Sequence, residues 1–186
     1  MKRILDISLS MLLIIVFIIP CLIIITLIKF SSKGPVIHWS KRIGKDNIIF
    51  EMPKFRTMKI ETPDLPTYSL KNPSLWITPI GKFLRKYSFD ELPQIYSILK
   101  KDMSFVGPRP ALHNQEKLIK MRTDNNIHKI LPGITGLAQI NGRDKLSLDQ
   151  KLKYEIEYAK SMSVFLDIKI VFKTILIVLR AKNIAH

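Results

Sequence analysis

The stretch MLLIIVFIIPCLIIITLI, residues 11–28, is a long apolar run, because its eighteen residues include no charged side chain. Eighteen residues in a helix extend roughly 27 Å, which is close to the ~30 Å hydrocarbon thickness of a bilayer. Length alone therefore permits a membrane span. Pro20 cannot donate a hydrogen bond to the carbonyl of Val16, so we expect a kink or a break at Ile19–Pro20.

Basic residues flank the apolar run on both sides: Lys2, Arg3, Lys29 and Lys33. Positive charge marks the cytoplasmic side of a membrane segment, so both ends are expected to stay on that side. We therefore predict two half-helices, about residues 4–19 and 21–30, that form a re-entrant hairpin; a single span is the alternative. A cleaved signal peptide is not expected, because no A-x-A-like site follows the run and Asp6 interrupts the basic start.

Composition limits the remaining possibilities. At 186 residues the chain is long enough for one compact domain besides the membrane element. Lys and Arg outnumber Asp and Glu by 30 to 15, and this excess favours an anionic partner such as phospholipid, nucleic acid or a phosphorylated substrate. Cys21 is the single cysteine, so no intrachain disulfide can form, and the four histidines are too scattered for a metal site.

The rest of the sequence predicts a small β-hairpin followed mainly by helices. Strands near 36–41 and 48–52 are joined by the turn-rich GKDN, and the proline-rich residues 60–79 are expected to form a surface loop. Four helices are predicted, over residues 88–101, 111–124, 147–161 and 164–183. The expected fold class is therefore α+β, mainly helical and membrane-associated.

Local signals mark the ends and faces of these helices. Capping boxes formed by Ser88 with Glu91 and by Ser147 with Gln150 are expected to begin two of them. The last helix carries a basic stripe on an otherwise apolar surface: Lys169, Lys173 and Arg180. This pattern fits an amphipathic helix lying at the membrane interface, although a core-packing helix is an equally good interpretation.

The stretch GKFLRKYSFDELPQIYSILKKDMSFVGPRP, residues 81–110, carries the strongest chemical signal. Adjacent carboxylates, Asp90 and Glu91, lie among the cations Arg85 and Arg109. A carboxylate can attack phosphorus or hold Mg²⁺, and arginine binds phosphate bidentately. The alternative is that the two carboxylates only cap a helix. Arg109 lies between two prolines, which suits a fixed anion clamp, or else a rigid turn.

Two further basic clusters could serve a polyanionic ligand. Lys54 and Arg56 lie in KFRTM, and Arg143 follows three glycines in PGITGLAQINGRD. The sequence holds none of the signature motifs of P-loop ATPases, dinucleotide-binding dehydrogenases, serine hydrolases or zinc metalloproteases.

Several motifs in order resemble the bacterial sugar transferases that are monotopic phosphoglycosyl transferases. They are KRILDI, the apolar run broken by Pro20, KFRTM, LRKYSFDELPQ, KDMSFVGPRP and PGITGLAQINGR. Departures from the family pattern, such as Ile19 before the hairpin proline, do not affect Asp90, Glu91 or Arg109.

The resemblance implies an enzyme of the bacterial inner membrane that moves a sugar-1-phosphate from a UDP-sugar to undecaprenyl phosphate and releases UMP. Residues 1–30 would form the re-entrant membrane hairpin, and residues 31–186 a cytoplasmic catalytic domain with a C-terminal interfacial helix. Membrane lipid is expected as a partner and nucleic acid is not, while the sugar and the oligomeric state are left open.

The resemblance also implies roles for individual residues. Asp90 would be the nucleophile, and Glu91 would assist in metal or proton handling. Asp90 and Glu91 would also be the residues that bind the Mg²⁺ cofactor. The phosphate-binding candidates are Lys54, Arg56, Arg85, Arg109 and Arg143. The rival hypothesis is a non-catalytic basic protein anchored to anionic lipid, which would bind in a salt-sensitive way without turnover.

Overall fold

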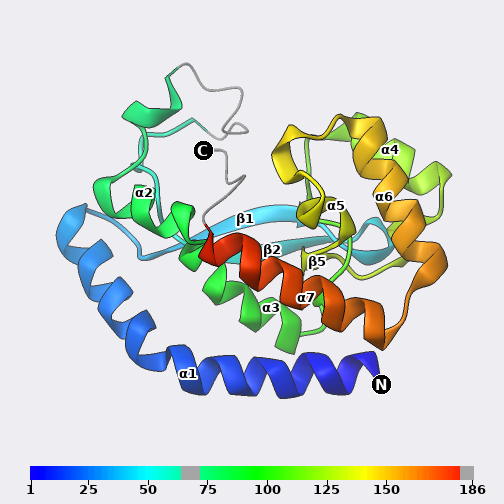
Figure 1. The fold of residues 1–186 in the computed structure, drawn as a ribbon. Helices are drawn as coiled ribbons and strands as arrows, with labels where there is room; N and C mark the ends of the chain where they lie inside the picture. Colours follow the sequence, from blue (N-terminus) through cyan, green and yellow to red (C-terminus); the bar gives the residue numbers. More distant parts are fainter. Residues whose placement is uncertain (64–71, 181–186) are drawn as a thin grey trace.

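A computed structural model describes residues 1–63 and 72–180 and shows a mainly helical α+β fold, as predicted (Figure 1). The α-helices are α1 (Lys2–Ser31), α2 (Pro79–Lys86), α3 (Ile95–Leu99), α4 (Glu116–Asp124), α5 (Leu137–Ile140), α6 (Leu148–Ser161) and α7 (Val164–Leu179). The 3₁₀ helices are η1 (Lys45–Asn47), η3 (Pro73–Leu75), η4 (Phe89–Gln94), η5 (Ile127–Lys129) and η6 (Arg143–Lys145). The strands are β1 (Ile37–Ile43), β2 (Ile49–Phe55), β3 (Ser104–Val106), β4 (Ala111–Leu112) and β5 (Gly133–Thr135).

Helix α1 contains the whole apolar run. It is one helix with Pro20 inside it, so the prediction of two separate half-helices, 4–19 and 21–30, is wrong in that respect. A proline removes one backbone hydrogen bond, and the helix can resume in the next turn. The helix bends part-way along its length, and its two arms do not fold back on each other (Figure 1). In the described part of the chain, α1 alone is long and apolar enough to cross a bilayer.

Both ends of α1 are attached to the globular part of the molecule. Near the start, the Arg3 guanidinium donates to the carbonyls of Ile98 and Leu99 at 2.6 and 2.8 Å. At the other end, the Arg56 guanidinium donates to the carbonyl of Ser32 at 2.8 Å. Carbonyls at a helix C-terminus have no partner within the helix, so this arginine satisfies an otherwise unpaired group. The same rigid unit therefore holds the two ends.

The predicted β-hairpin is confirmed, with longer strands than expected. β1 and β2 pair antiparallel, with Ile37 opposite Phe55, and β4 adds to the free edge of β1 in the order β2-β1-β4. β4 takes up the start of the helix predicted over 111–124, so that helix begins only at Glu116. A separate parallel pair joins β3 to β5.

The prediction of one helix over residues 88–101 needs the largest correction. Residues 89–94 form the 3₁₀ helix η4, and α3 ends at Leu99. Ser88 adopts a left-handed backbone with φ of 56° and makes no capping bond, so the Ser88–Glu91 capping box is wrong. The Glu91 side chain turns instead toward basic residues. By contrast, the capping box of Ser147 with Gln150 is confirmed at the start of α6.

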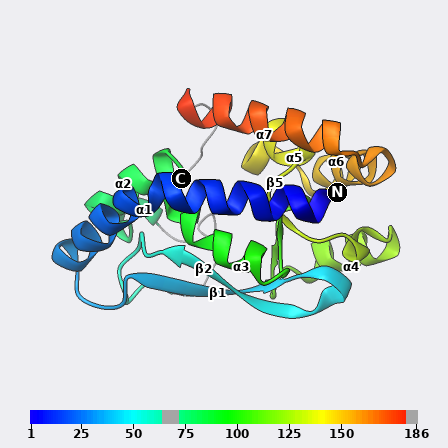
Figure 2. The same ribbon diagram turned by 90° about the horizontal axis from the view of Figure 1, so that it is seen from below.

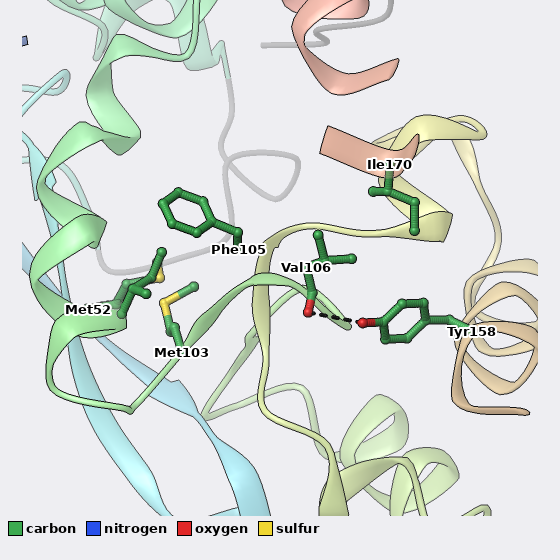
Figure 3. Close-up of a cluster of buried hydrophobic side chains, with 7 residues drawn as sticks. Met52, Met103, Phe105, Val106, Tyr158 and Ile170 are labelled. Carbon is green, nitrogen blue, oxygen red and sulfur yellow. Dashed lines mark hydrogen bonds between the residues drawn. The ribbon is translucent and has the colours of Figure 1, made fainter. Parts of the chain in front are cut away.

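Two buried clusters hold the elements together. The larger one joins β2, β3, α3, α6 and α7, and six of its members are labelled in Figure 3: Met52, Met103, Phe105, Val106, Tyr158 and Ile170. The smaller one packs Ile24 and Ile28 of α1 against Phe55 and Leu84. Helix α1 is therefore part of the core as well as an apolar surface.

Helix α7 fits both interpretations of the C-terminal segment. Ile170 is fully buried, whereas Phe165 and Phe172 on the same helix are exposed. The last residues of the helix predicted over 164–183 lie outside the described residues, as do residues 64–71 of the loop predicted over 60–79. At the ends of that loop, Met58 bridges to Ile77 and α2 begins at Pro79.

Candidate active site

Glu91 is the centre of a cluster of charges contributed by four parts of the chain. Its Oε1 atom lies 2.7 Å from Arg109 Nη2, 3.2 Å from Lys54 Nζ and 3.4 Å from Arg143 Nη2. Asp90 lies beside it, with Oδ2 4.0 Å from Lys54 Nζ. Both acidic residues are buried, and their side chains are only 12% and 8% exposed for Asp90 and Glu91. The structure therefore brings together two acidic and three basic side chains that the sequence had singled out.

The two carboxylates differ in their electrostatic surroundings. Burial alone would raise the pKa of Glu91, but Arg109, Lys54 and Arg143 outweigh it and hold that pKa well below its usual range. Burial raises the pKa of Asp90, and Lys54 opposes this only in part. Neighbouring carboxyls whose pKa values are pushed apart are suited to different chemical roles. Glu91 is fixed by its ion pairs, whereas Asp90 is the less engaged of the two.

The position of Arg109 follows from the pairing of β3 with β5. The N–H of Gly107 donates to the carbonyl of Thr135, and the N–H of Gly133 donates to the carbonyl of Pro108, both at 2.9 Å. A Cβ atom at Gly133 would collide with the backbone nitrogen of Gly107, so this close approach requires glycine. The anchored backbone then directs Arg109 to Glu91.

Arg143 reaches the cluster from a strained turn. Its φ of 52° lies in the left-handed region, and Gly142 before it has φ of 146°. A non-glycine residue in this region is uncommon and often occurs at functional sites. Ser88, two residues before Asp90, has the same left-handed backbone. Strained positions thus lie close to the charge cluster in two separate segments.

The two remaining phosphate-binding candidates, Arg85 and Arg56, lie in different surroundings. Arg85 donates from Nε to Thr57 Oγ1 at 2.9 Å and is close enough to Asp90 to influence its pKa. Arg56 is buried, and its guanidinium donates to the Ser32 and Lys33 carbonyls at the end of α1. Arg56 is therefore not brought into the charge cluster.

Sequence reasoning missed Arg42 of β1. Its Nη1 donates to the carbonyl of Pro110 at 3.3 Å, and its charge helps to lower the pKa of Lys54, for which burial is the main cause. The only signal for Arg42 in the sequence was that it follows Lys41 in the region of the predicted hairpin. Strands at a protein surface commonly carry such basic residues, so this signal did not point to a site.

Sequence reasoning also missed the polar contacts that join α1 to β3. The buried carboxylate of Asp6 accepts from Ser104 Oγ and from the N–H of Phe105, at 3.0 and 3.1 Å. Lys2 Nζ donates to the Val106 carbonyl at 3.0 Å and pairs with Asp167 at 2.6 Å. An acidic residue beside an apolar run was the available signal, because a buried carboxylate requires partners.

The acidic side chains limit how a metal could bind. Across residues 1–63 and 72–180, no group of three or more His, Cys, Asp or Glu side chains could hold an ion. Mg²⁺ commonly uses one or two carboxylates together with substrate phosphates and water. Asp90 and Glu91 fit that donor set, in which a phosphorylated substrate would complete the coordination.

Comparison with known proteins gives a consistent result. The family described as "Bacterial sugar transferase" matches residues 1–181. A UDP-glucose:undecaprenyl-phosphate glucose-1-phosphate transferase of Klebsiella pneumoniae is 41% identical over 182 residues, covering 94% of this chain and 39% of the relative. An undecaprenyl-phosphate galactose phosphotransferase of Salmonella typhimurium is 33% identical over 196 residues, covering 97% and 40%.

A third relative is closer in length. The exopolysaccharide production protein ExoY of Sinorhizobium fredii is 34% identical over 190 residues, covering 94% of this chain and 83% of the relative. The chain thus spans about two fifths of the two phosphotransferases and most of ExoY. In all three cases the similarity covers nearly the whole of this chain.

Proposed function

Because the chain belongs to the bacterial sugar transferase family, we propose that it transfers a sugar-1-phosphate from a UDP-sugar to undecaprenyl phosphate and releases UMP. The names of the Klebsiella and Salmonella relatives describe this reaction for glucose and for galactose. The observation that carries the proposal is the buried Asp90–Glu91 pair among three cations. The product would start a surface glycan, as the name of ExoY suggests for that protein.

The first step of the proposed reaction uses Asp90 as the nucleophile. A carboxylate oxygen of Asp90 forms a bond to the phosphorus that bears the sugar, and the bond from that phosphorus to the bridging oxygen breaks. UMP leaves with the electron pair, and the sugar phosphate stays on the enzyme as an acyl phosphate of Asp90. The raised pKa of Asp90 supports this role, because a carboxylate that is poorly stabilised as an anion is a stronger nucleophile.

The second step transfers the sugar phosphate to the lipid. An oxygen of undecaprenyl phosphate bonds to the same phosphorus, the bond to Asp90 breaks, and the carboxylate is restored. Phosphoryl transfer depends mainly on positioning and on neutralising charge. Arg109, Lys54 and Arg143 supply positive charge at this point, and Glu91 holds the three together.

Mg²⁺ would be held by Asp90 and Glu91 and would neutralise charge on the diphosphate. The lysine and arginines around Glu91 supply part of the same neutralisation. Glu91 therefore has two proposed functions, in metal binding and in orienting the cations.

The proposed location is the cytoplasmic face of the inner membrane. Helix α1 would enter the bilayer and return, since both of its ends are bound to the same globular unit and carry basic residues. A water-soluble nucleotide sugar and a lipid phosphate could then meet at the membrane surface. The exposed apolar side chains of α1 and α7 support contact with lipid.

Covalent trapping tests the proposed function. Purified protein is incubated with Mg²⁺ and either UDP-glucose or UDP-galactose in the absence of lipid acceptor, and its intact mass is measured. We expect one added hexose phosphate on the wild type and none on Asp90→Asn, with UMP release lost in that variant. Asp124→Asn removes an exposed carboxylate at the end of α4 and should behave as wild type.

The outcomes separate the enzyme from the binding protein. Turnover by a folded Asp90→Asn protein would overturn the assigned nucleophile. If the wild type releases no UMP from any UDP-sugar yet binds anionic vesicles, the non-catalytic membrane-anchored protein is the correct alternative.

A further inference from the structure

An apolar groove lies between the first arm of α1 and helix α7. The two helices lie beside each other in the view of Figure 2. Residues of both helices line a groove with a volume of about 670 Å³. Ten of its eleven lining residues are apolar, and Ser8 is the one polar residue among them. The volume falls within the roughly 300–1,000 Å³ range of ligand-binding clefts.

The lining excludes several classes of ligand. A nucleotide sugar carries many polar groups, and each one buried without a partner costs free energy. A peptide brings backbone N–H and C=O groups, and within the lining only the Ser8 side chain could pair with them. A hydrocarbon chain has no such requirement. It would also gain by burying surface against Leu12, Phe172 and Ile175.

Aromatic residues connect α1 to the segment that carries Asp90. Leu12 is the last residue of α1 that lines the groove, and five residues farther along the same helix Phe17 packs against Phe89 with ring centroids 6.3 Å apart. Phe89 is the residue before Asp90 and also packs against Phe83 and Tyr87. Figures 1 and 2 both place the C-terminal end of α7 and the bend of α1 on the side of α2, the helix that precedes η4.

We propose that this groove binds the prenyl chain of the lipid acceptor and directs its phosphate toward Asp90. The inference rests on the proposed function, since it assigns a binding surface to the second substrate. Continuity with the aromatic residues beside Asp90 favours the acceptor over an ordinary phospholipid. The acceptor must bring its phosphate to Asp90 in the proposed reaction, whereas a membrane phospholipid takes no part in that reaction.

The test compares two prenyl phosphate acceptors of very different chain length, undecaprenyl phosphate and the short geranyl phosphate. Phe172→Asn places an amide in the groove, and we expect the KM for undecaprenyl phosphate to rise about tenfold or more. The KM for geranyl phosphate and the kcat values should change little. Phe165→Asn is the matched control, because Phe165 lies on the same helix, is 79% exposed and does not line the groove.

Each outcome has a distinct meaning. An equal rise with both asparagine variants would mean that α7 acts only through general contact with the membrane, and an equal rise for both acceptors would mean a structural effect; either result overturns the proposal. Absence of turnover with the wild type and both acceptors would instead refute the proposed function itself.

Direct crosslinking supplies a second measurement that does not depend on the asparagine variants. A photoreactive benzoylphenylalanine at position 172 should capture radiolabelled undecaprenyl phosphate, and the same residue at position 165 should capture much less. Unlabelled undecaprenyl phosphate should compete for the capture at 172, whereas a phospholipid in equal amount should not. Competition by phospholipid would assign the groove to membrane lipid and overturn the proposal.

Discussion

Asp90 and Glu91 are neighbours in the sequence, yet the fold gives their carboxylates different partners. Glu91 makes three contacts with cations within 3.4 Å, whereas the nearest one to Asp90 is Lys54 at 4.0 Å. The negative charge of Glu91 is therefore stabilised in the folded state, and that of Asp90 is not. Burial without a close cation makes the charge of Asp90 a cost to stability, which is consistent with the proposed catalytic role, because functional residues commonly carry such a cost.

This difference predicts opposite effects on stability at neutral pH. The raised pKa of Asp90 means that its charged form opposes folding above that pKa, so Asp90→Asn should raise the thermal midpoint. The lowered pKa of Glu91 means that its charge supports folding at neutral pH and that this support is lost as pH falls through the folded value. Glu91→Gln leaves three cations without their carboxylate and should cost about 3–5 kcal/mol.

Differential scanning calorimetry of the two variants at pH 7 in the same detergent checks this prediction. The cost of Glu91→Gln corresponds to a fall in the midpoint on the order of 10 °C for a chain of this size. A fall of similar size in Asp90→Asn would show that Asp90 contributes to folding rather than to chemistry.

Arg109 carries a separate prediction, because its guanidinium geometry and its charge can be distinguished. Arg109→Lys keeps the charge but loses the planar fork, so kcat/KM should fall by about 1–3 kcal/mol in transition-state stabilisation. Steady-state release of UMP measures this, with the thermal midpoint as a check on folding. Wild-type turnover in the variant would reduce Arg109 to a part of the turn between β3 and β4.

At the scale of elements, the sequence predicted best where local signals and tertiary contacts agree. The hairpin of β1 and β2 and the cap at Ser147 are confirmed, because turn and capping residues act locally. The cap at Ser88 is wrong, because the charges of Lys54, Arg109 and Arg143 compete for Glu91 from distant segments. A local sequence pattern such as a capping box holds no information on partners from distant segments of the chain.

The candidate site follows the same rule. Asp90, Glu91 and Arg109 belong to one stretch of sequence, so their meeting in one cluster could be foreseen. Arg56 has the same residue type as Arg143, yet the fold uses Arg56 to cap α1 and brings Arg143 to Glu91. Composition does not distinguish these two arginines, because only the packing of α1 decides which carbonyls need a donor.

Helix α1 carries the prediction at this scale. In a Cys21→Ser background, one cysteine is added before Met1 and, in a second variant, another replaces Lys33. A membrane-impermeant maleimide should label both positions only after the cytoplasmic side is opened, because both ends of α1 are bound to the same globular unit. Labelling of either end from outside intact cells would show a spanning helix.

For the whole molecule, α1 is part of the core as well as the element proposed to enter the membrane. Ile24 and Ile28 pack against Phe55 and Leu84, and Asp6 is buried against β3. Burying each of these isoleucines contributes roughly 1.5–3 kcal/mol. Together that is a large share of the ~5–15 kcal/mol stability of a typical domain.

A chain that lacks residues 1–31 should therefore aggregate rather than yield a soluble catalytic domain. Size-exclusion chromatography after expression without detergent checks this result. The matched control lacks residues 181–186 and should remain folded in detergent, since the described helix α7 ends at Leu179. A monodisperse and active truncated protein would show that residues 32–186 fold independently.

The clamp that Arg3 and Arg56 place on the two ends of α1 also governs how the protein responds to bilayer thickness. A spanning helix adjusts to a thicker or thinner bilayer by changing its tilt. In the proposed re-entrant arrangement, α1 would have both ends fixed to one body on one side of the bilayer, so a change in bilayer thickness would not change its tilt. The proposed release of UMP should therefore depend little on the acyl-chain length of the surrounding lipid.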